Sequence, residues 1–220
     1  FSKPAEQAGG KTIRRITDPR ADAIGLGLPV AEASAKLVLG VGGGTSEGIV
    51  ISQGAAAVTE SRRVAGDEAT EAIARYLRRT YQLAVGENMA EQIKMTIGSA
   101  MPLEETHTFR CRGKDVEKGV PKMVELTNND IIEALGEINE EFISMVQRLI
   151  SQTPADLSDD LKRDGIHLTG GGSMLKGLGQ RLSQETGLEV KVPDEPLFSV
   201  VLGLGLILEN MSYYKSVFVN

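Results

Sequence analysis

The chain has 220 residues, of which 41% are hydrophobic, so it can bury a sizeable core in one large domain or two small ones. Its net charge of −6 argues against a general nucleic-acid binder, and we expect no nucleic-acid partner. The lone cysteine, Cys111, excludes an internal disulfide and a cysteine-rich metal site, and it suits a reducing cytoplasm. The longest apolar run, residues 200–208, is too short to span a bilayer, and the start at Phe1 without a methionine predicts a fragment.

The first 35 residues predict little regular structure. Residues 1–10 lack hydrophobic periodicity and predict a loose lead-in, and residues 11–15 predict a short strand. Asp18 is expected to cap a short helix in which Pro19 takes the first position, because a proline needs no N–H donor there.

A glycine turn between two strands is the first candidate binding site. Residues 37–39 predict a buried strand, and residues 48–52 and 55–64 predict two more. Between the first two strands lie three glycines and two hydroxyl residues: Gly42, Gly43, Gly44, Thr45 and Ser46. The backbone amides of such a turn are not shielded by side chains and can hold a phosphate, with the hydroxyls as further donors. The residues alone favour the alternative, a turn that only reverses the chain.

Two helices are predicted after these strands. The first begins at Gly66 with Asp67 as its cap, and the second begins near Asn88, which forms a capping-box pattern with Glu91. Glu91 and Lys94 lie one turn apart and project to the same side of the second helix. The spacing alone favours an ordinary surface ion pair of little energetic weight.

A hairpin and a long helix are predicted next. Residues 106–112 and 120–126 alternate in polarity, which is typical of two paired strands. Thr127 and Asp130 are then expected to open the longest helix of the chain, which Pro154 ends.

A second glycine turn follows the strand predicted at residues 165–169. The strand runs into three more glycines: Gly170, Gly171 and Gly172. Ser173 is expected to cap the helix that follows, and this order of strand, glycine turn and helix N-terminus favours an anion or a closely packed nucleotide. His167 lies in the middle of the strand and is expected to be a satisfied core residue, not a catalytic base.

The last part of the chain predicts a strand at residues 188–192 and an apolar helix at residues 199–210. The tail, residues 211–220, carries three aromatic residues. Its sequence leaves open whether it docks on this chain or on a partner.

Taken in order, these segments resemble the actin-like ATPase superfamily, and within it the MreB family of bacterial cell-shape proteins. The most specific pieces are Val-Gly-Gly-Gly-Thr-Ser-Glu at residues 41–47 and Leu-Thr-Gly-Gly-Gly at residues 168–172. Shorter matching segments lie at residues 18–19, 23–25, 65–68, 71–73, 86–87, 90–94, 97–100, 202–203 and 208–210. Each piece is short, but the ordered set covers residues 11–210.

The resemblance implies an α/β fold: the ribonuclease-H-like domain of actin-type ATPases, a mixed sheet flanked by helices, with a small inserted α+β subdomain. Residues 1–65 and 163–220 would form the core subdomain, and residues 66–162 the insertion. The N-terminal half of the family fold, with its first phosphate loop, has no counterpart here.

The resemblance also implies the nucleotide contacts. Asp18 matches the acidic position that orients the attacking water. The glycine turn would hold the β- and γ-phosphates, the second predicted helix would meet the ribose and base, and the second turn would close over the adenosine. The implied binding residues are Gly42, Gly43, Gly44, Thr45, Asp67, Glu91, Gln92, Ile93, Lys94, Gly170, Gly171, Gly172, Ser173 and Met174.

Three departures from the family pattern bear on the implied cofactors, ATP and Mg²⁺. The first phosphate loop is missing, so we expect no ATP turnover by this chain alone. Gly40 stands where the family carries an aspartate that helps to hold hydrated Mg²⁺, which puts the metal in doubt. Asp18 stands where the family carries a glutamate, and the shorter side chain moves the carboxylate.

The leading hypothesis is an MreB-like cytoskeletal subunit that binds ATP, polymerises with itself into filaments and determines rod cell shape. Cell-shape and wall-synthesis membrane proteins are further expected partners, and we expect a cytoplasmic protein whose membrane association lies in the missing half. One alternative is a filament or scaffold module that has lost hydrolysis. Another is a different superfamily member, a chaperone ATPase or a sugar kinase, although no substrate domain or sugar-site insertion is visible.

Overall fold

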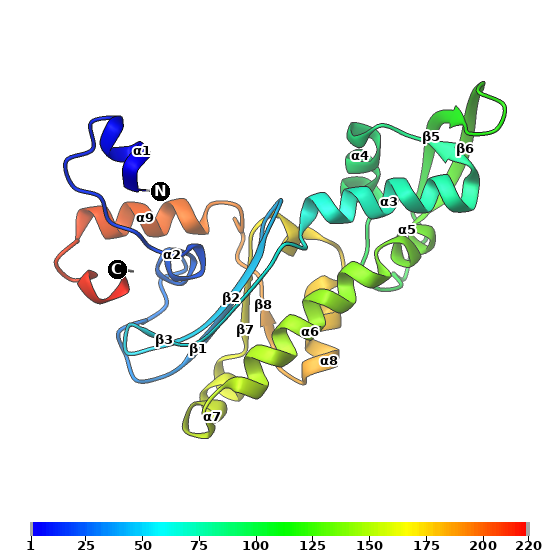
Figure 1. The fold of residues 1–220 in the computed structure, drawn as a ribbon. Helices are drawn as coiled ribbons and strands as arrows, with labels where there is room; N and C mark the ends of the chain where they lie inside the picture. The colour runs from blue at the N-terminus through cyan, green and yellow to red at the C-terminus, as the bar shows by residue number, and fades with distance from the viewer. Residues whose placement is uncertain (1, 219–220) are drawn as a thin grey trace.

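The structure is a computed structural model that describes residues 2–218 and contains two β-sheets (Figure 1). The larger sheet has five strands in the order β3-β2-β1-β7-β8. Strand β1 pairs with β2 in antiparallel fashion and with β7 in parallel fashion, so the sheet is mixed, as predicted. The strands are β1 (Lys36–Val41), β2 (Ser46–Ser52), β3 (Ala55–Arg62), β7 (Ile166–Thr169) and β8 (Val190–Lys191).

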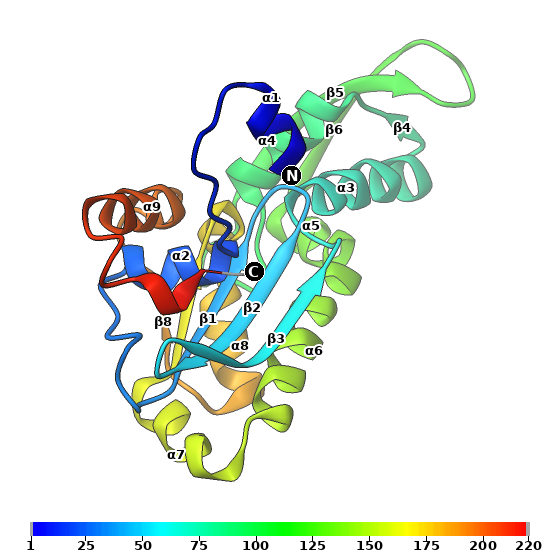
Figure 2. The same cartoon turned by 60° about the vertical axis from the view of Figure 1, so that its left-hand side comes forward.

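Helices cover both faces of this sheet (Figures 1 and 2). One face carries α6 (Gly136–Gln152) and α8 (Leu178–Thr186), and the other carries α2 (Asp18–Gly25) and α9 (Ser199–Glu209). Successive side chains of a strand point to opposite faces. Accordingly Leu37 and Leu39 join the core under α6, whereas Val38 joins the core under α2. The continuous apolar run of β1 is thus explained by burial on both sides.

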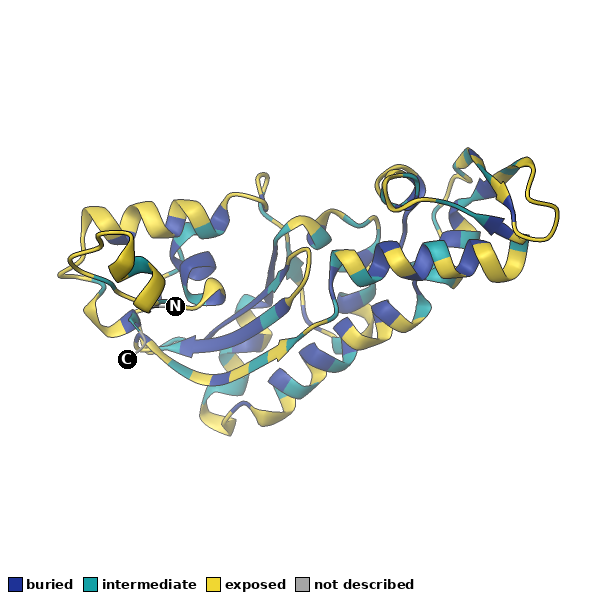
Figure 3. Cartoon of the chain, turned by 45° about the horizontal axis from the view of Figure 1, so that its top comes forward, coloured by how far each residue is buried: buried dark blue, intermediate teal, exposed yellow. Residues whose placement is uncertain are grey.

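Helices α2 and α9 approach each other closely at two glycines. A Cβ atom at Gly25 would lie 1.9 Å from the carbonyl oxygen of Ser199, and one at Gly203 would lie 1.9 Å from that of Ala21. Both distances are far below van der Waals contact, so the backbones themselves form the interface. The opposite side of α9 is apolar and exposed, with Leu208 72% accessible (Figure 3).

The smaller sheet has three antiparallel strands in the order β4-β5-β6, and three helices pack around it (Figure 1). Its elements are α3 (Gly66–Tyr81), β4 (Leu83–Ala84), α4 (Glu87–Ile97), β5 (Thr108–Asp115), β6 (Pro121–Thr127) and α5 (Asn128–Ala134). The apolar residues of α3 and α4 face each other, with Ile73 and Ile93 fully buried. The subdomain boundary predicted at residues 66–162 stays a prediction.

The start of the chain differs from the sequence expectation. Residues 2–7 form a short helix, α1 (Ser2–Gln7), where a loose lead-in was expected, because alanine, glutamate and glutamine favour helix. The strand predicted at residues 11–15 is absent from the described structure. Of residues 11–15 only Arg15 takes part in β-pairing, as a single bridge, so no strand extends along this segment.

For two helices the sequence predicted the wrong N-cap residue. Thr17, not Asp18, precedes α2, so Asp18 is the first helical residue. Ala65, not Asp67, precedes α3, and its N–H donates to the carboxylate of Glu68 at 2.9 Å. In both cases the acidic residue lies inside the first turn, where its charge still complements the helix dipole.

The later helices show one wrong cap and one confirmed cap. Gly86, not Asn88, precedes α4, so the predicted capping box with Glu91 is wrong. Thr127 and Asp130 do form a capping box, with the Thr127 N–H donating to the Asp130 carboxylate at 2.7 Å. The helix that they open is not the longest one, because α5 ends at Ala134 and, after Leu135, α6 begins anew at Gly136.

The tail folds back on the chain. A 3₁₀ turn, η2 (Lys215–Val217), places Val217 in the core beside α2, where it is 1% exposed. The guanidinium of Arg20 donates to the carbonyl of Val217 at 2.8 Å. The tail therefore packs on this chain up to Phe218, and residues 219–220 lie outside the described structure.

Candidate functional site

The first glycine turn is a tight hairpin between β1 and β2. The N–H of Gly42 donates to the carbonyl of Thr45 at 2.9 Å and closes the turn. Gly43 and Gly44 form its exposed tip, and within residues 2–218 their N–H groups donate to no backbone carbonyl. Ser46 is fully buried, and its hydroxyl donates to the carbonyl of Val64, so it does not serve the turn as predicted.

The hairpin rests on the start of helix α3. The N–H of Gly66 donates to the carbonyl of Gly42 at 3.0 Å, and that of Asp67 donates to Gly43 at 2.8 Å. The carboxylate of Asp67 lies 3.5 Å from the Cβ position of Gly43. These contacts bring the predicted residue Asp67 against the hairpin tip.

The second glycine turn follows β7. Gly170 adopts the left-handed backbone conformation, with φ of +78°, and the next residues form a 3₁₀ turn, η1 (Gly171–Met174). Ser173 was expected to cap the following helix, but its hydroxyl donates to the carbonyl of Gly170 at 2.6 Å. Helix α8 begins later, after Gly177, so its N-terminus does not follow the glycines directly as predicted.

The two turns lie side by side at the C-terminal ends of two neighbouring strands of the larger sheet. Strands β1 and β7 are parallel neighbours in which Gly40 pairs with Thr169, so both turns leave the sheet at the same end. A Cβ atom at Gly170 would lie 2.3 Å from the carbonyl oxygen of Val41, and one at Gly172 would lie 2.2 Å from Val41 Cγ1. Only glycine allows this approach, and Val41 forms the wall that the two turns share.

A small hollow of about 90 Å³ lies between the first turn, α2 and the start of α9. This volume suits a phosphate-sized group and is well below the roughly 300 Å³ of a typical small-molecule pocket. Its lining contains Asp18, Pro19, Asp22, Gly40, Val41, Gly42, Thr45, Glu47, Gly170, Pro196, Leu197 and Val200. It thus joins the predicted catalytic residue Asp18 to residues of both turns.

Three carboxylates face this hollow, and the sequence indicated only one of them. Asp18 is exposed, whereas Asp22 is 2% exposed and follows it by one helical turn. Burial raises the pKa of Asp22, although hydrogen bonds from Ser199 and Thr169 oppose the shift. Burial and then the charges of Asp18 and Asp22 raise the pKa of Glu47. The i, i+4 spacing of Asp18 and Asp22 is the signal that could have identified the second acid.

Lys94 joins helix α4 to the start of α3. Its ammonium donates to the carbonyl of Gly66 at 2.7 Å and to the hydroxyl of Thr70 at 2.9 Å, and it pairs with Glu91 at 2.6 Å. Burial raises the pKa of Glu91, but hydrogen bonds from Lys94 and Thr70 outweigh it and hold the pKa below its usual value. The pair is therefore a bridge between helices and not an isolated surface pair.

The other predicted residues of this segment lie in different surroundings. Gln92 is exposed, whereas Ile93 is fully buried in the core. The segment after α4 contacts the segment after the second turn, because the N–H of Ala100 donates to the carbonyl of Lys176 at 2.8 Å. Met174 is 62% exposed at the turn itself. The hairpin, α4 and the second turn thus form one contiguous region.

A sequence profile of the MreB/Mbl protein family matches residues 1–216. The chain belongs to the MreB/Mbl family. The cell shape-determining protein MreB of Escherichia coli is 42% identical to it over 205 residues, which are 93% of this chain and 59% of that protein.

Two solved structures also resemble the chain. MreB5 of Spiroplasma citri bound to ADP superposes with a TM-score of 0.92 at 25% identity, covering 98% of this chain and 65% of that one. A double helical filament of MamK gives a TM-score of 0.73 at 17% identity, covering 88% of this chain and 59% of that one, and supports the fold alone. The predicted actin-like fold is confirmed, and this MreB/Mbl chain spans about 59–65% of the length of these three proteins.

Two features of the described part of this MreB/Mbl chain bear on membranes and metals. No helix within residues 2–218 is long and apolar enough to cross a membrane. No group of three or more histidine, cysteine, aspartate or glutamate side chains in the same range is placed to ligate a metal directly.

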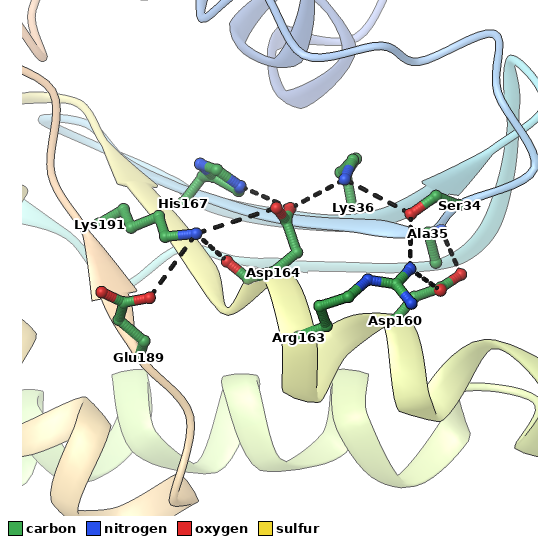
Figure 4. Close-up of polar contacts among 9 residues, drawn as sticks. All are labelled: Ser34, Ala35, Lys36, Asp160, Arg163, Asp164, His167, Glu189 and Lys191. Atoms are coloured by element: carbon green, nitrogen blue, oxygen red, sulfur yellow. Dashed lines mark hydrogen bonds and ion pairs between the residues drawn. The ribbon is translucent and has the colours of Figure 1, made fainter.

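His167 has a partner that the sequence did not reveal. Its ring lies 2.8 Å from the carboxylate of Asp164, the last residue of α7 (Ala155–Asp164), as Figure 4 shows. The same carboxylate lies 3.3 Å from Lys36 and 3.9 Å from Lys191. Burial raises the pKa of Asp164, but the bonds and charges of His167 and Lys36 outweigh it and lower the pKa. His167 is thus a satisfied residue in an ion-pair cluster that ties α7 to β1 and β7.

We expect Asp164→Asn to lower the free energy of unfolding by about 1–3 kcal/mol at pH 7, because the buried Lys36 loses its anion and the His167 ring loses a carboxylate partner. A carboxylate with a lowered pKa stabilises the fold above its unfolded pKa of 3.8, so the difference should shrink as the pH falls below about 4. Urea unfolding at pH 7 and pH 3 measures both. The control is Asp159→Asn on the same helix, whose side chain is 89% exposed. An equal loss in the control would contradict the role of the cluster.

Proposed function

We propose that this chain is the nucleotide-binding portion of an MreB-type filament subunit. It would bind ATP or ADP along the two glycine turns and polymerise with itself to determine cell shape. The observation that carries the proposal is the shared wall at Val41, which holds a phosphate-type hairpin and a second glycine turn side by side. MreB5, a relative with the same fold, was solved with ADP and with AMPPNP, which supports an adenine nucleotide.

Each part of the site has a proposed task. The free amides of Gly43 and Gly44, with the hydroxyl of Thr45, would receive phosphate oxygens. The turn at residues 170–174 would cover the adenosine, and α4 would border the ribose and base. Asp18 would orient water at the terminal phosphate. Cytoplasmic location, contact with wall-synthesis membrane proteins and membrane binding through a segment not present here belong to the same proposal.

Magnesium fits this site only as a hydrated ion. Mg²⁺ typically keeps several waters and is held by one or two carboxylates together with phosphates. The carboxylates of Asp18, Asp22 and Glu47 line the hollow and could accept hydrogen bonds from such waters. When bound, the ion would neutralise charge on the phosphates, and the protein residues would fix its water shell.

Gly171→Val tests the nucleotide site. A Cβ at Gly171 meets only Leu197 Cδ2, at 3.3 Å, so the fold tolerates the side chain while the isopropyl group blocks access to the turn. We expect the affinity for ADP, measured by calorimetry, to fall at least about tenfold because the side chain blocks the site. A tenfold fall corresponds to a loss of about 1.4 kcal/mol of binding free energy. Gly205→Ala on α9, which meets no neighbour within 4 Å, is the control. Unchanged affinity in Gly171→Val would rule out this role for the turn.

A second candidate is a filament scaffold without hydrolysis, and Gly40 is the observation that favours it. Strand β1 presents no side chain to the phosphate hollow at this position. We expect the chain alone to show no magnesium-dependent ATP turnover in a phosphate-release assay. Turnover that Asp18→Ala abolishes would overturn the scaffold hypothesis. Electron microscopy of the chain with nucleotide tests filament formation under both hypotheses.

A further inference from the structure

The space beside Gly40 is filled by a carboxylate from another element. A Cβ atom at Gly40 would lie 2.9 Å from Asp22 Oδ2 and 3.3 Å from Thr169 Oγ1. Asp22 belongs to helix α2, across the hollow from strand β1. The carboxylate therefore lies too close to position 40 for a side chain there, and the two cannot be present together without a shift.

Two hydroxyl groups hold the Asp22 carboxylate in this orientation. Thr169 Oγ1 donates to one oxygen at 2.9 Å, and Ser199 Oγ donates to the other at 2.6 Å. Thr169 is the last residue of β7, directly before the second glycine turn, and Ser199 begins α9. Each carboxylate oxygen has lone pairs left to accept further hydrogen bonds, and the side chain lines the hollow.

The burial of Asp22 is not explained by a contribution to the stability of the fold. It is 2% exposed, and within residues 2–218 it forms no ion pair with a lysine, arginine or histidine. A buried carboxylate without a counter-ion destabilises the fold, and such groups concentrate at functional sites. Asp18 and Glu47 add negative charge to the same hollow, which an incoming cation would relieve.

We propose that Asp22 supplies, from helix α2, the carboxylate that strand β1 lacks at Gly40. It acts as a positioning residue, because it fixes the water shell of the hydrated Mg²⁺ that accompanies the nucleotide phosphates. This inference rests on the proposed nucleotide function. The absence of a side chain at Gly40 then leaves room for the Asp22 carboxylate. The pocket keeps an acidic side chain, but it comes from helix α2 and not from strand β1.

A double-mutant cycle tests, without any ligand, whether a carboxylate at position 22 replaces one at position 40. Gly40→Asp is expected to lower the melting temperature, because it forces two carboxylates together. Asp22→Ala is expected to lower it, because two buried hydroxyls lose their acceptor. The double variant Asp22→Ala/Gly40→Asp should recover at least about half of the summed loss, since neighbouring groups are not additive. If Gly40→Asp fails to fold, folding of the double variant is the supporting result. Additive losses would overturn the proposal.

Asp22→Asn tests the role toward the ion. The amide keeps the shape and removes the buried charge, so the melting temperature should be equal to that of the unchanged chain or higher. The gain in ADP affinity on adding Mg²⁺ should nevertheless fall about tenfold or more, as for other residues that orient metal-bound water. Asp194→Asn, an exposed acid outside the hollow, is the matched control. A lower melting temperature with an unchanged magnesium effect would mean a structural role only and overturn the proposal.

The two failures can be told apart. Absence of ADP binding by the unchanged chain, with and without Mg²⁺, would contradict the proposed function. The cycle at positions 22 and 40 would still decide whether Asp22 has taken the place of the missing side chain.

Discussion

Replacing Gly203 with alanine is expected to lower the free energy of unfolding by about 3 kcal/mol or more, at or beyond the upper end of the usual range for overpacking. The new Cβ would lie 1.9 Å from the carbonyl oxygen of Ala21, and a backbone atom in a helix cannot rotate away. Helices α2 and α9 would have to separate, which would also strain the hydrogen bond between Ser199 and Asp22. Urea unfolding followed by circular dichroism measures the loss.

Gly205→Ala is the matched control on the same helix. No atom lies within 4 Å of a Cβ at this position, so only helix propensity changes. We expect a gain of up to about 1 kcal/mol, because alanine favours helix over glycine by that amount. Similar losses in Gly203→Ala and Gly205→Ala would show that the close contact between α2 and α9 is not what holds these helices.

Gly172→Ala is expected to have the second largest effect, and on both stability and binding. Its Cβ would lie 2.2 Å from Val41 Cγ1, and Val41 is 1% exposed and cannot move into solvent. The second turn must therefore lift away from β1, at a cost of about 1–3 kcal/mol. If ADP binds along this turn, its affinity should fall more than about tenfold at the same time, which calorimetry measures.

The neighbouring Gly171→Ala separates steric strain from a general effect of adding a methyl group to this turn. The nearest atom, Leu197 Cδ2, lies 3.3 Å from the new Cβ and belongs to a side chain that is 60% exposed. We expect a stability change within about 0.5 kcal/mol. A loss as large as that of Gly172→Ala would contradict the proposed contact between the second turn and Val41.

The sequence predicted the elements with strong local signals. The apolar run of β1, the glycines after it and the Thr127 capping box depend on adjacent residues, and the structure contains all three. Caps at Ala65 and Gly86 were missed because these residues have no polar side chain to mark a helix start. The family match through residue 216 confirms the ordered motifs, whereas the roles of the individual site residues stay predictions.

Contacts between distant segments could not be predicted from one sequence. Asp22 lies between two alanines in a short helix, which suggests a solvent-facing acid, yet its partners Thr169 and Ser199 are far along the chain. The parallel pairing of β1 with β7 has the same origin, because no local pattern indicates which strands become neighbours. The place of Asp22 in the hollow depends on that pairing, because its partner Thr169 ends β7 beside Gly40.

The shared wall at Val41 has a mechanical consequence. This residue ends β1, leads directly into the hairpin at Gly42 and supports both Gly170 and Gly172. A group that pushes the second turn outward must push against the strand from which the first turn hangs. If a nucleotide binds along both turns as proposed, its release from the second turn should therefore also loosen its contacts with the first.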